Sequence, residues 1–560
     1  MILKYQVNVI WNDEWVLADP LIKLHQHTLQ LSDFWVMHHD HRLPIPLAIM
    51  SVLAVLTYWN TQVECFFGYA MVCMASLLLA VLLRSPAAND SPSSSWKWKW
   101  FAVNVLLFSP VQCENWLFGF GACQNFLPLP LLVAALVLID RKGLNWRTVL
   151  LSAALIESAS LSLANGLLGW PLLFAFIALS NKTRDPRQKR QFLGIWLLAA
   201  ILSIALHLWH HQSEPITAQF HAAGIIERVQ YFLVFLGTAL FYGLSDPIPL
   251  ATCMGIVLIG WFIWLLIRFI QRWFHGSRES IEPALPWLVL GGYAVGSAIL
   301  GALGRAGLGV EQAGTSRYTT ISICLLICLI GIPTFHRHVS NRLSQPSAIL
   351  NFQHVITSLL VAALIWAGVR SIGVCAQSQR HYRIVLAHLS FIELVMEPST
   401  ERLISYRTDL LKIADTLDQL GYLHPPLIKN GDVRLLQPSG SIANSESNGI
   451  VEAVWQSPDG QMHARGWSIL PALHRAADSV LVSYDTPDGK QQICAIADVV
   501  QSRPDLAKTG GEYLQQAGWS AAFPSNRLPA QSTPLKFWAY DAEHQQAFPL
   551  AKAAEPQLPR

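Results

Sequence analysis

Long apolar segments recur between residue 65 and residue 370 of the chain. A helix needs about 20 residues to cross a hydrocarbon core of about 30 Å, and many segments here approach that length with few charged residues inside them. The predicted spans lie near 65–84, 100–115, 124–140, 148–163, 166–181, 193–209, 249–270, 286–304, 317–334 and 352–370. This pattern predicts a mostly α-helical, polytopic transmembrane bundle of about 10–12 membrane segments.

Two further apolar stretches, 44–59 and 229–243, break the alternation of loops if each is counted as a span. Both of their ends would then fall on the outer side, so we interpret them as interfacial or re-entrant helices. The alternative is that they span and that one loop is assigned to the wrong side. The opening residues, MILKYQVNVIW, are too few to cross a bilayer and lack a signal-peptide pattern, which leaves open a missing first helix.

Basic residues in the short loops predict the orientation, because cytoplasmic loops carry an excess of Lys and Arg. The clearest case is SNKTRDPRQKRQ, residues 180–191, which is predicted to be cytoplasmic. Alternation then places residues 109–125, residues 304–318 and everything after residue 371 on the outer face. We expect a multi-pass protein of a bacterial cytoplasmic membrane with an extracytoplasmic, periplasmic C-terminal part.

The sequence becomes polar and mixed after residue 371, and its periodicity changes twice. Residues up to 432 carry apolar positions at helical spacing, which predicts an amphipathic helical connector. Residues 449–560 alternate apolar and polar positions about turn signals, which predicts a small antiparallel β-sandwich. The predicted organisation is a first extracytoplasmic loop (1–43), a transmembrane helical domain (44–370), an extracytoplasmic helical connector (371–432) and a β-sandwich domain (449–560).

Composition agrees with a membrane protein and argues against a nucleic-acid partner. The chain is 52% hydrophobic and 13% charged, against roughly 25% charged residues in a typical soluble domain. Its net charge of +3 is dispersed and forms no basic tract. The nine cysteines contain no CxxC pair, and a disulfide between Cys113 and Cys123 on the oxidising face is an open alternative.

Ionisable residues gather near the start of the chain, on the predicted outer face. An acidic pair is followed by a histidine-rich knot: Asp13, Glu14, His38, His39, Asp40, His41 and Arg42. Such groups beside a membrane are costly unless they face water, a partner or a substrate. The acidic pair could instead form a solvated loop or a helix-capping turn. The knot could be an anchor that contacts lipid headgroups. It could also be a metal site, although the sequence shows no evident second set of ligands.

Two later clusters on the same predicted face carry chemistry that suits a sugar and a phosphate. Gln112, Glu114 and Asn115 stand among aromatic residues, and amides and carboxylates beside aromatic faces match sugar hydroxyls and C–H faces. The second cluster is Arg305, Arg317 and Tyr318, where arginine suits a phosphate at the membrane surface. Interfacial packing around a structural Asn, and a span-end Arg-Tyr anchor, are the alternatives.

The order of these motifs resembles bacterial polytopic proteins related to the GT-C glycosyltransferases. It comprises the acidic pair, an H-x-H-R knot, FSPVQCENWLFGF, SLANGLLGWP and GRAGLG…TSRYTTIS, and the resemblance covers roughly residues 8–370. It implies that Asp13 or Glu14 acts as general base or orients the acceptor, and that Arg317, or next Arg305, holds a lipid phosphate. Two features depart from the family pattern, the absent first helix and Cys113, where an aromatic residue is expected.

The resemblance implies transfer of a sugar from a polyprenyl-phosphate donor to a glycan, lipid or protein acceptor of the cell envelope. A carboxylate would take the acceptor proton and cations would stabilise the departing phosphate, with inversion at the anomeric carbon. No nucleotide is expected, because GRAGLG lies between spans rather than after a strand. A divalent cation is left open.

Two other function classes remain. A carrier or flippase for a lipid-linked saccharide should place paired ionisable residues at mid-membrane depth, where Glu157 and His207 are the candidates. A non-catalytic envelope scaffold would use the β-sandwich to bind glycan. The candidate stacking residues of that domain, which could equally belong to its core, are Trp455, Trp467, Trp519 and Trp538.

Overall fold

The computed structural model describes most of the chain and divides it into two compact units. The described residues are 1–38, 41–84, 95–183, 185–209, 223–275, 282–332, 347–395, 404–405, 408–438, 448–529 and 534–552. The first unit, called the helical unit here, comprises residues 1–6, 26–53 and 62–376. The second, called the β-unit, comprises residues 7–25, 54–61 and 377–560.

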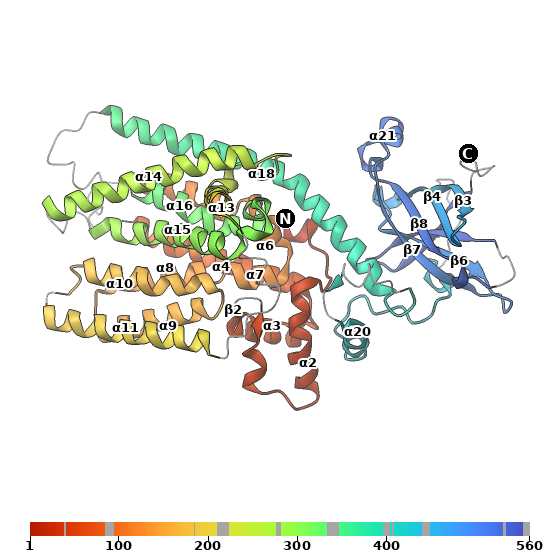
Figure 1. The fold of residues 1–560 in the computed structure, drawn as a ribbon, viewed down its shortest axis with the longest axis horizontal. Coiled ribbons are helices and arrows are strands. Elements are labelled where there is room, and N and C mark those ends of the chain that lie inside the picture. Colours follow the sequence, from red (N-terminus) through yellow and green to blue (C-terminus); the bar gives the residue numbers. More distant parts are fainter. Residues whose placement is uncertain are drawn as a thin grey trace. The chain divides into compact units, whose positions relative to one another are not determined.

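The helical unit is a bundle of roughly aligned helices (Figure 1). Its helices are α3 (Pro44–Thr57), α4 (Thr61–Leu83), α5 (Ser95–Leu107), α6 (Cys113–Leu117), α7 (Gly119–Asn125), α8 (Pro128–Lys142), α9 (Trp146–Ser160), α10 (Gly169–Leu179), α11 (Pro186–Leu208), α13 (Ile225–Gly237), α14 (Ile248–His275), α15 (Leu285–Arg305), α16 (Ser316–Gly331) and the start of α18 (Ser347–Ser390). Among the described residues, six helical stretches are long and apolar enough to cross a membrane. The predicted mostly helical, polytopic fold is confirmed, with six such stretches in the described ranges against the 10–12 membrane segments predicted.

Local capping explains where two of these helices begin. The side chain of Asn145 accepts the backbone N–H of Thr148 at 3.1 Å, and the Thr148 hydroxyl accepts the N–H of Asn145 at 3.0 Å, which starts α9. Asp185 accepts the N–H of Arg187 at 2.8 Å, and Pro186 occupies the first position of α11. Both starts follow directly from the local sequence.

Polar contacts join the loops at one end of the helical unit. Lys182 lies 3.3 Å from Asp140, which links the α10–α11 loop to the end of α8. The hydroxyl of Ser180 donates to Glu282 at 2.9 Å and links the same loop to the start of α15. All three loops are predicted to face the cytoplasm. Their meeting at one end supports the alternation of spans, while the side that this end faces stays a prediction from loop charge.

The helices α3 and α13 are shorter than a membrane span. They contain 14 and 13 residues, or about 20 Å at 1.5 Å per residue, so neither crosses a core of about 30 Å. Helix α13 packs closely on α14, because a Cβ at Gly237 would lie 2.0 Å from the Ala251 carbonyl oxygen and a Cβ at Gly255 would lie 2.1 Å from that of Leu233. The short lengths agree with the interfacial or re-entrant interpretation. They do not set these two helices apart, because α5, α9, α10 and α16, which lie in predicted spans, contain only 11 to 16 residues.

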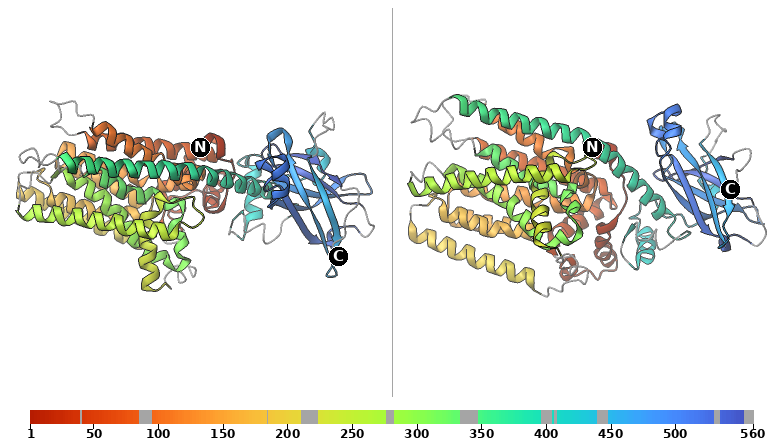
Figure 2. Two further views of the ribbon diagram at one scale, coloured as in Figure 1. Left: turned by 90° about the horizontal axis from the view of Figure 1, so that it is seen from above. Right: turned by 45° about the horizontal axis from the view of Figure 1, so that its top comes forward.

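The C-terminal domain of the β-unit is built on one rolled sheet (Figures 1 and 2). Its described strands are β3 (Gly449–Gln456), β4 (Gln461–Leu470), β5 (Arg475–Ala476), β6 (Ser479–Asp485), β7 (Gln491–Gln501), β8 (Gly518–Pro524), β9 (Lys536–Asp541), β10 (Gln546–Pro549) and β11 (Ala551–Lys552). They hydrogen-bond in the order β10-β9-β6-β7-β8-β4-β3-β11, with β5 on β4. The predicted C-terminal β-domain is confirmed.

A single residue closes this sheet. β10 pairs with β9 at one edge and β11 pairs with β3 at the other, yet only Leu550 separates β10 from β11. The two edges must therefore meet at this point, which makes the sheet barrel-like and leaves few exposed strand edges. Its inner face is filled by alternate apolar residues of the strands, among them the buried Trp519, Phe523 and Phe537.

The connector is helical and its apolar spacing explains its packing. Helix α18 continues without a break to Ser390, and helix α20 spans Leu410–Gln419. The buried residues of α20 are Leu410, Ile413, Ala414 and Leu417, which are spaced as one face of a helix. The predicted helical character of this region therefore agrees with the structure.

Contacts from the connector reach the sheet at several points. Ile493 in β7 donates its N–H to the Gly431 carbonyl at 2.8 Å, and Gln491 donates its N–H to Asp432 at 3.2 Å. A hydrogen bond from Arg434 lowers the pKa of Asp432 to about 2, so this carboxylate stays charged and keeps accepting. The other end of the sheet meets α18, where Arg383 lies 2.6 Å from Glu543.

These contacts predict that a fragment of residues 377–552 unfolds at a higher temperature than one of residues 449–552. The shorter fragment keeps its own apolar core but loses the partners of Gln491, Ile493 and Glu543. Thermal unfolding followed by circular dichroism measures the difference. A fragment of residues 408–552, which retains Asp432 but lacks α18, should fall between them. Equal midpoints for all three would contradict the prediction.

Candidate active site

Polar residues from four segments gather at the end of the helical unit opposite the 180–186 loop. The segments are the short hairpin of β1 (Met37–His38) and β2 (His41–Arg42), the turn leading into α6 and α7, the end of α11, and the junction of α15 and α16. They are predicted to be extracytoplasmic.

An ion pair joins α6 to the first turn of α16. The carboxylate of Glu114 lies 3.0 Å from the Arg317 guanidinium and also accepts the backbone N–H of Arg317 at 3.3 Å. The backbone N–H of Glu114 in turn donates to the Ser316 hydroxyl at 3.1 Å. The side chains of Arg317 and Glu114 are 40% and 26% exposed, so this pair is accessible from outside the bundle.

Buried amides hold α6 in this position. Asn115 donates to the Arg317 carbonyl at 3.0 Å and to the Thr320 hydroxyl at 2.8 Å, and it accepts from Asn125 at 2.8 Å. The Thr320 hydroxyl donates to Gln112 at 2.7 Å. Gln112 and Asn115 are each 1% exposed. Both amides thus fill the structural role that the sequence left open beside sugar binding, and Glu114 is the accessible polar member of the motif.

A second cluster lies behind this ion pair, among α13, α15 and α16. Arg305 donates to the Tyr318 hydroxyl at 2.9 Å, and the Tyr318 ring packs 5.2 Å from the ring of Phe235. The Tyr231 hydroxyl donates to the side-chain oxygen of Gln312 at 3.4 Å. The structure therefore places Arg305, Arg317 and Tyr318 near one another at the α15–α16 junction, while their binding of a phosphate stays a prediction.

An apolar groove runs along the outside of α13 and α15. It has a volume of about 470 Å³ and is lined by Ala223, Ile225, Arg228, Val229, Phe232, Ile299, Ala302 and Leu303. Ile225 is 80% exposed and Val229 is 53% exposed. Tyr231 lies on the other side of α13, where a Cβ at Gly301 would lie 3.2 Å from its ring. Only one layer of helix thus separates the groove from the arginine–tyrosine cluster.

Sequence inspection missed this groove, although a signal for it exists. Ile225, Arg228, Val229 and Phe232 follow the i, i+3, i+4, i+7 spacing of a single helical face. That spacing marks an amphipathic surface helix, but it does not indicate which partner helix forms the second wall. The residues of α15 that form this second wall lie next to α13 only in the folded structure.

The arginine of the histidine-rich knot has a structural role. Arg42 is 3% exposed and donates to the Trp35 carbonyl at 2.7 Å and to the Trp209 carbonyl, with its guanidinium 5.1 Å from the Trp35 ring. His38 packs edge-on to Phe120 at 5.3 Å. His39 and Asp40 lie outside the described residues, as does the side chain of His41. Arg42 thus fixes the hairpin to the end of α11.

The acidic pair belongs to the β-unit and divides into two roles. It lies in the 3₁₀ turn η1 (Asn12–Leu17), where the carboxylate of Glu14 accepts the Trp11 N–H at 3.0 Å as part of a capping box. Glu14 is 1% exposed, whereas Asp13 is half-buried. The capping role that the sequence left open therefore falls to Glu14, and Asp13 is the more accessible carboxylate.

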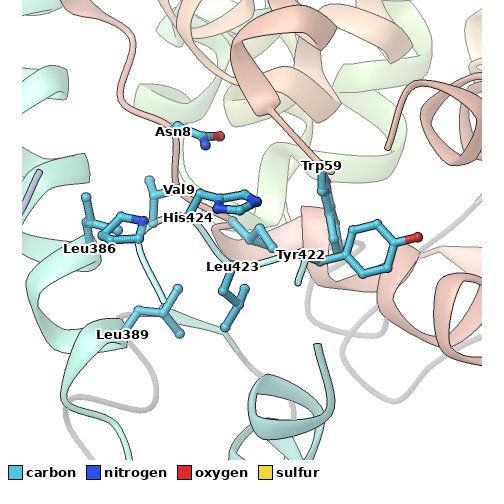
Figure 3. Close-up of a pocket in the computed structure, with 10 residues that line it drawn as sticks. Asn8, Val9, Trp59, Leu386, Leu389, Tyr422, Leu423 and His424 are labelled. Atoms are coloured by element: carbon cyan, nitrogen blue, oxygen red, sulfur yellow. The ribbon is translucent and has the colours of Figure 1, made fainter. Parts of the chain in front are cut away.

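A small cleft in the β-unit brings the start of the chain next to the connector (Figure 3). It is lined by Asn8, Val9, Ile10, Trp59, Leu386, Leu389, Tyr422, Leu423, His424 and Pro425. Its volume of about 10 Å³ is that of roughly one water. Asn8 accepts the backbone N–H of Thr61 at 2.9 Å beside it. The cleft is too small for a sugar ring and is not a substrate site.

Cys113 and Cys123 do not form the disulfide that the sequence left open, because both are free, buried thiols. Cys113 lies 3.5 Å from the Tyr242 hydroxyl, while Cys123 points toward the Glu64 carbonyl at 4.0 Å. Distinct neighbours on α4 and after α13 keep the two sulfurs apart. Within the described ranges, no group of three or more His, Cys, Asp or Glu residues could hold a metal ion.

Comparisons with known proteins return a distant structural likeness. No protein-family model matches the chain, and none of the curated proteins matches it. Two solved structures are similar to it: the archaeal oligosaccharyltransferase AglB from Archaeoglobus fulgidus in complex with an inhibitory peptide and a dolichol-phosphate, and the Archaeoglobus fulgidus oligosaccharyltransferase in the apo form. Each has a TM-score of 0.38 and 13% identity, covering 72% of this chain and 56% of the other.

The chain thus matches little more than half the length of these two proteins.

Proposed function

We propose that the chain is an integral membrane glycosyltransferase that moves a sugar from a polyprenyl-phosphate donor to an envelope acceptor on the outer face of the membrane. One observation carries the proposal. An apolar groove runs along the outside of α13 and α15, and the accessible side chain of Arg317 lies at the same end of the bundle. The proposed donor, a hydrocarbon chain ending in a phosphate and a sugar, matches this combination.

The proposed donor would divide between these two surfaces. Its isoprenoid chain would lie against Ile225, Val229 and Leu303, where burial of apolar surface stabilises it. Its phosphate would meet Arg317, whose planar fork suits two phosphate oxygens, with Arg305 close behind. Glu114 would keep the Arg317 fork oriented and limit the mobility of the side chain.

Transfer also needs a base, and the motif resemblance of the sequence implies a carboxylate of the acidic pair, of which Asp13 is the more accessible. A carboxylate takes the proton of an acceptor hydroxyl as that oxygen attacks the anomeric carbon, while the sugar–phosphate bond breaks and the phosphate leaves with its charge. Arginine at the phosphate stabilises that charge in the transition state. Glu14 is less suited, because its carboxylate is buried and accepts the Trp11 N–H.

A carrier or flippase is the second candidate, and the placement of two residues argues against it. Glu157 lies three residues before the end of α9, and His207 lies one residue before the end of α11. The end of α11 is fixed to Arg42 and the hairpin. Both ionisable groups are therefore near one end of the bundle, whereas a carrier should place such groups near mid-depth.

The first prediction concerns Arg317. Replacing it with alanine removes a charge-assisted contact and should reduce transfer roughly 10- to 100-fold, while Arg317→Lys, which keeps the charge, should lose less. The readouts are the loss of one sugar from the surface glycan of cells and the accumulation of its lipid-linked donor. Lys182→Ala removes an ion pair at the opposite end of the bundle and serves as the control. Equal activity of Arg317→Ala and the parent protein would contradict the proposed phosphate contact.

The second prediction concerns the groove. Val229→Trp should fill it and raise the donor concentration needed for half-maximal transfer, because the added indole occupies the volume of the lipid chain. The matched control is Leu198→Trp, which adds the same ring at a position of α11 that is 57% exposed. Transfer in proteoliposomes at several donor concentrations separates the two variants. If both behave alike, the groove does not bind the donor.

The third prediction tests which of the two acidic residues, Asp13 or Glu14, acts as the base. Asp13→Asn should reduce transfer by roughly 10²–10⁴-fold, the range for loss of a general base, because an amide cannot accept the proton. Glu14→Gln keeps an oxygen for the Trp11 N–H and should retain most activity. Protein levels in the membrane, measured by immunoblot, control for misfolding. Full activity of Asp13→Asn would exclude the mechanism with Asp13 as base.

A further inference from the structure

The outer face of strands β3, β4 and β8 carries an aromatic platform that the fold does not use for its core. Trp455 pairs across the strands with His463, and His463 pairs with Ala522. The rings of Trp455 and His463 are stacked, with centroids 5.1 Å apart and an angle of 11° between planes. Ala522 is exposed and small, so the sheet beside His463 is open.

The platform is held in a fixed orientation. His463 hydrogen-bonds through Nε2 to the Ser457 hydroxyl at 3.1 Å, and that hydroxyl donates to Asp459. Asp459 also accepts the backbone N–H of Gln461 at 3.4 Å. The tight turn between β3 and β4 therefore fixes the imidazole and, by stacking, the indole. A ring pair fixed in this way loses little conformational entropy when a ligand stacks on it.

A row of polar side chains lies next to the platform on the same face. Arg465 pairs across the strands with Ser520, whose hydroxyl accepts from Gln501 at 2.6 Å. Both Arg465 and Ser520 are exposed. Among the described residues no hydrogen bond or ion pair engages the Arg465 guanidinium, whereas Arg503 nearby pairs with Glu452 at 2.8 Å. Arg465 is thus a cation available to a ligand.

The aromatic platform and the row of polar side chains are spaced to suit neighbouring sugar units of one polymer. His463 and Arg465 are two residues apart in β4, which is roughly 7 Å along a strand, with both side chains on one face. A sugar ring stacked on Trp455 would place an adjoining acidic group within reach of Arg465. A neutral sugar would use the platform but leave the guanidinium without a partner.

We propose that this face, formed by Trp455, His463, Arg465 and Ser520, binds an acidic glycan through one stacked sugar ring and one carboxylate or phosphate group. A free outer face of the stacked pair contacts the C–H face of the sugar, and Arg465 binds its anionic group as a fork. The proposal goes beyond sugar transfer, because binding here needs neither donor nor reaction.

The other tryptophans of the domain do not offer such a surface. Trp519 and Trp538 are buried, and the indole N–H of Trp538 donates to Ser483 at 2.9 Å. Trp467 packs against Leu514 and Ala517. Tyr513, which is 38% exposed, lies edge-on to His474 at 6.1 Å with no parallel stack. It gives a matched aromatic–histidine pair elsewhere on the same domain.

The test measures binding of polygalacturonate and of dextran, a neutral polymer, to the full-length protein in lipid nanodiscs by biolayer interferometry. We expect polygalacturonate to bind and dextran to bind at least tenfold more weakly. Arg465→Gln should weaken polygalacturonate binding roughly 10- to 100-fold, the range for loss of a hydrogen bond to a charged group. Trp455→Ala should weaken it roughly tenfold, and Tyr513→Ala should leave it unchanged.

Several results would overturn the proposal. If Arg465→Gln binds as the parent does, or if dextran binds equally well, the acidic class is wrong. If neither polymer binds, or if Tyr513→Ala weakens binding as much as Trp455→Ala, the assigned face is wrong. Arg465 is exposed, so its variant should fold normally, and the thermal midpoint of each variant checks this. Failure here leaves the transferase proposal standing, because the Arg317 and Val229 variants test that separately.

Discussion

The contact on which the candidate site most depends is the hydrogen bonding of one buried amide. Asn115 bridges α6 and α16, 202 and 205 residues apart in sequence, and its oxygen accepts from Asn125. An amide buried without such partners would cost several kcal/mol, so Asn115 and its partners hold α6, α7 and α16 together. In the accessible Glu114–Arg317 pair, Glu114 is the residue next to Asn115 on α6, and Arg317 itself accepts from Asn115 through its carbonyl. Its geometry therefore follows from a polar contact inside the bundle.

Short helices give this end of the helical unit its chemistry. Spanning helices satisfy their own backbone groups and present apolar surfaces, whereas short elements end inside the fold and expose side chains and helix termini. Helix α6 has five residues, yet it supplies Glu114 and Asn115. Helix α13 is packed on α14 through glycines and forms one wall of the apolar groove. The groove and the arginines therefore lie together where the spanning helices end.

In the β-unit, closure of the sheet separates a buried apolar face from an outward polar face. Because β10 and β11 lie at opposite edges but are joined through Leu550, the sheet encloses its apolar residues and turns its other face outward. Connector residues and α18 cover part of that outer surface, as the Arg383–Glu543 pair shows. The face that carries Trp455 and Arg465 keeps Arg465 and Ser520 exposed, and its Trp455 ring is half-buried. Strand alternation thus assigns one set of residues to the core and the next set to a surface.

The sequence by itself determined the class of the molecule and the position of most elements. Apolar length predicted the helical, polytopic part of the chain, and a change of period from 3.6 to 2 predicted the β-domain. These features depend on local composition, which acts within one helix or strand. The clusters at Glu114 and at Arg305–Tyr318 were also visible, because their members are close in sequence.

Only the tertiary structure decided which of these residues are accessible. Whether an amide meets a sugar or a neighbouring helix depends on contacts between residues about 200 positions apart, and no local pattern encodes that distance. Gln112, Asn115 and Arg42 were therefore assigned to structural contacts only once their partners were seen. The same holds for Glu14, whose carboxylate caps its own turn, and for the groove, whose second wall comes from α15. Side-chain chemistry is local, but burial is a property of the packed chain.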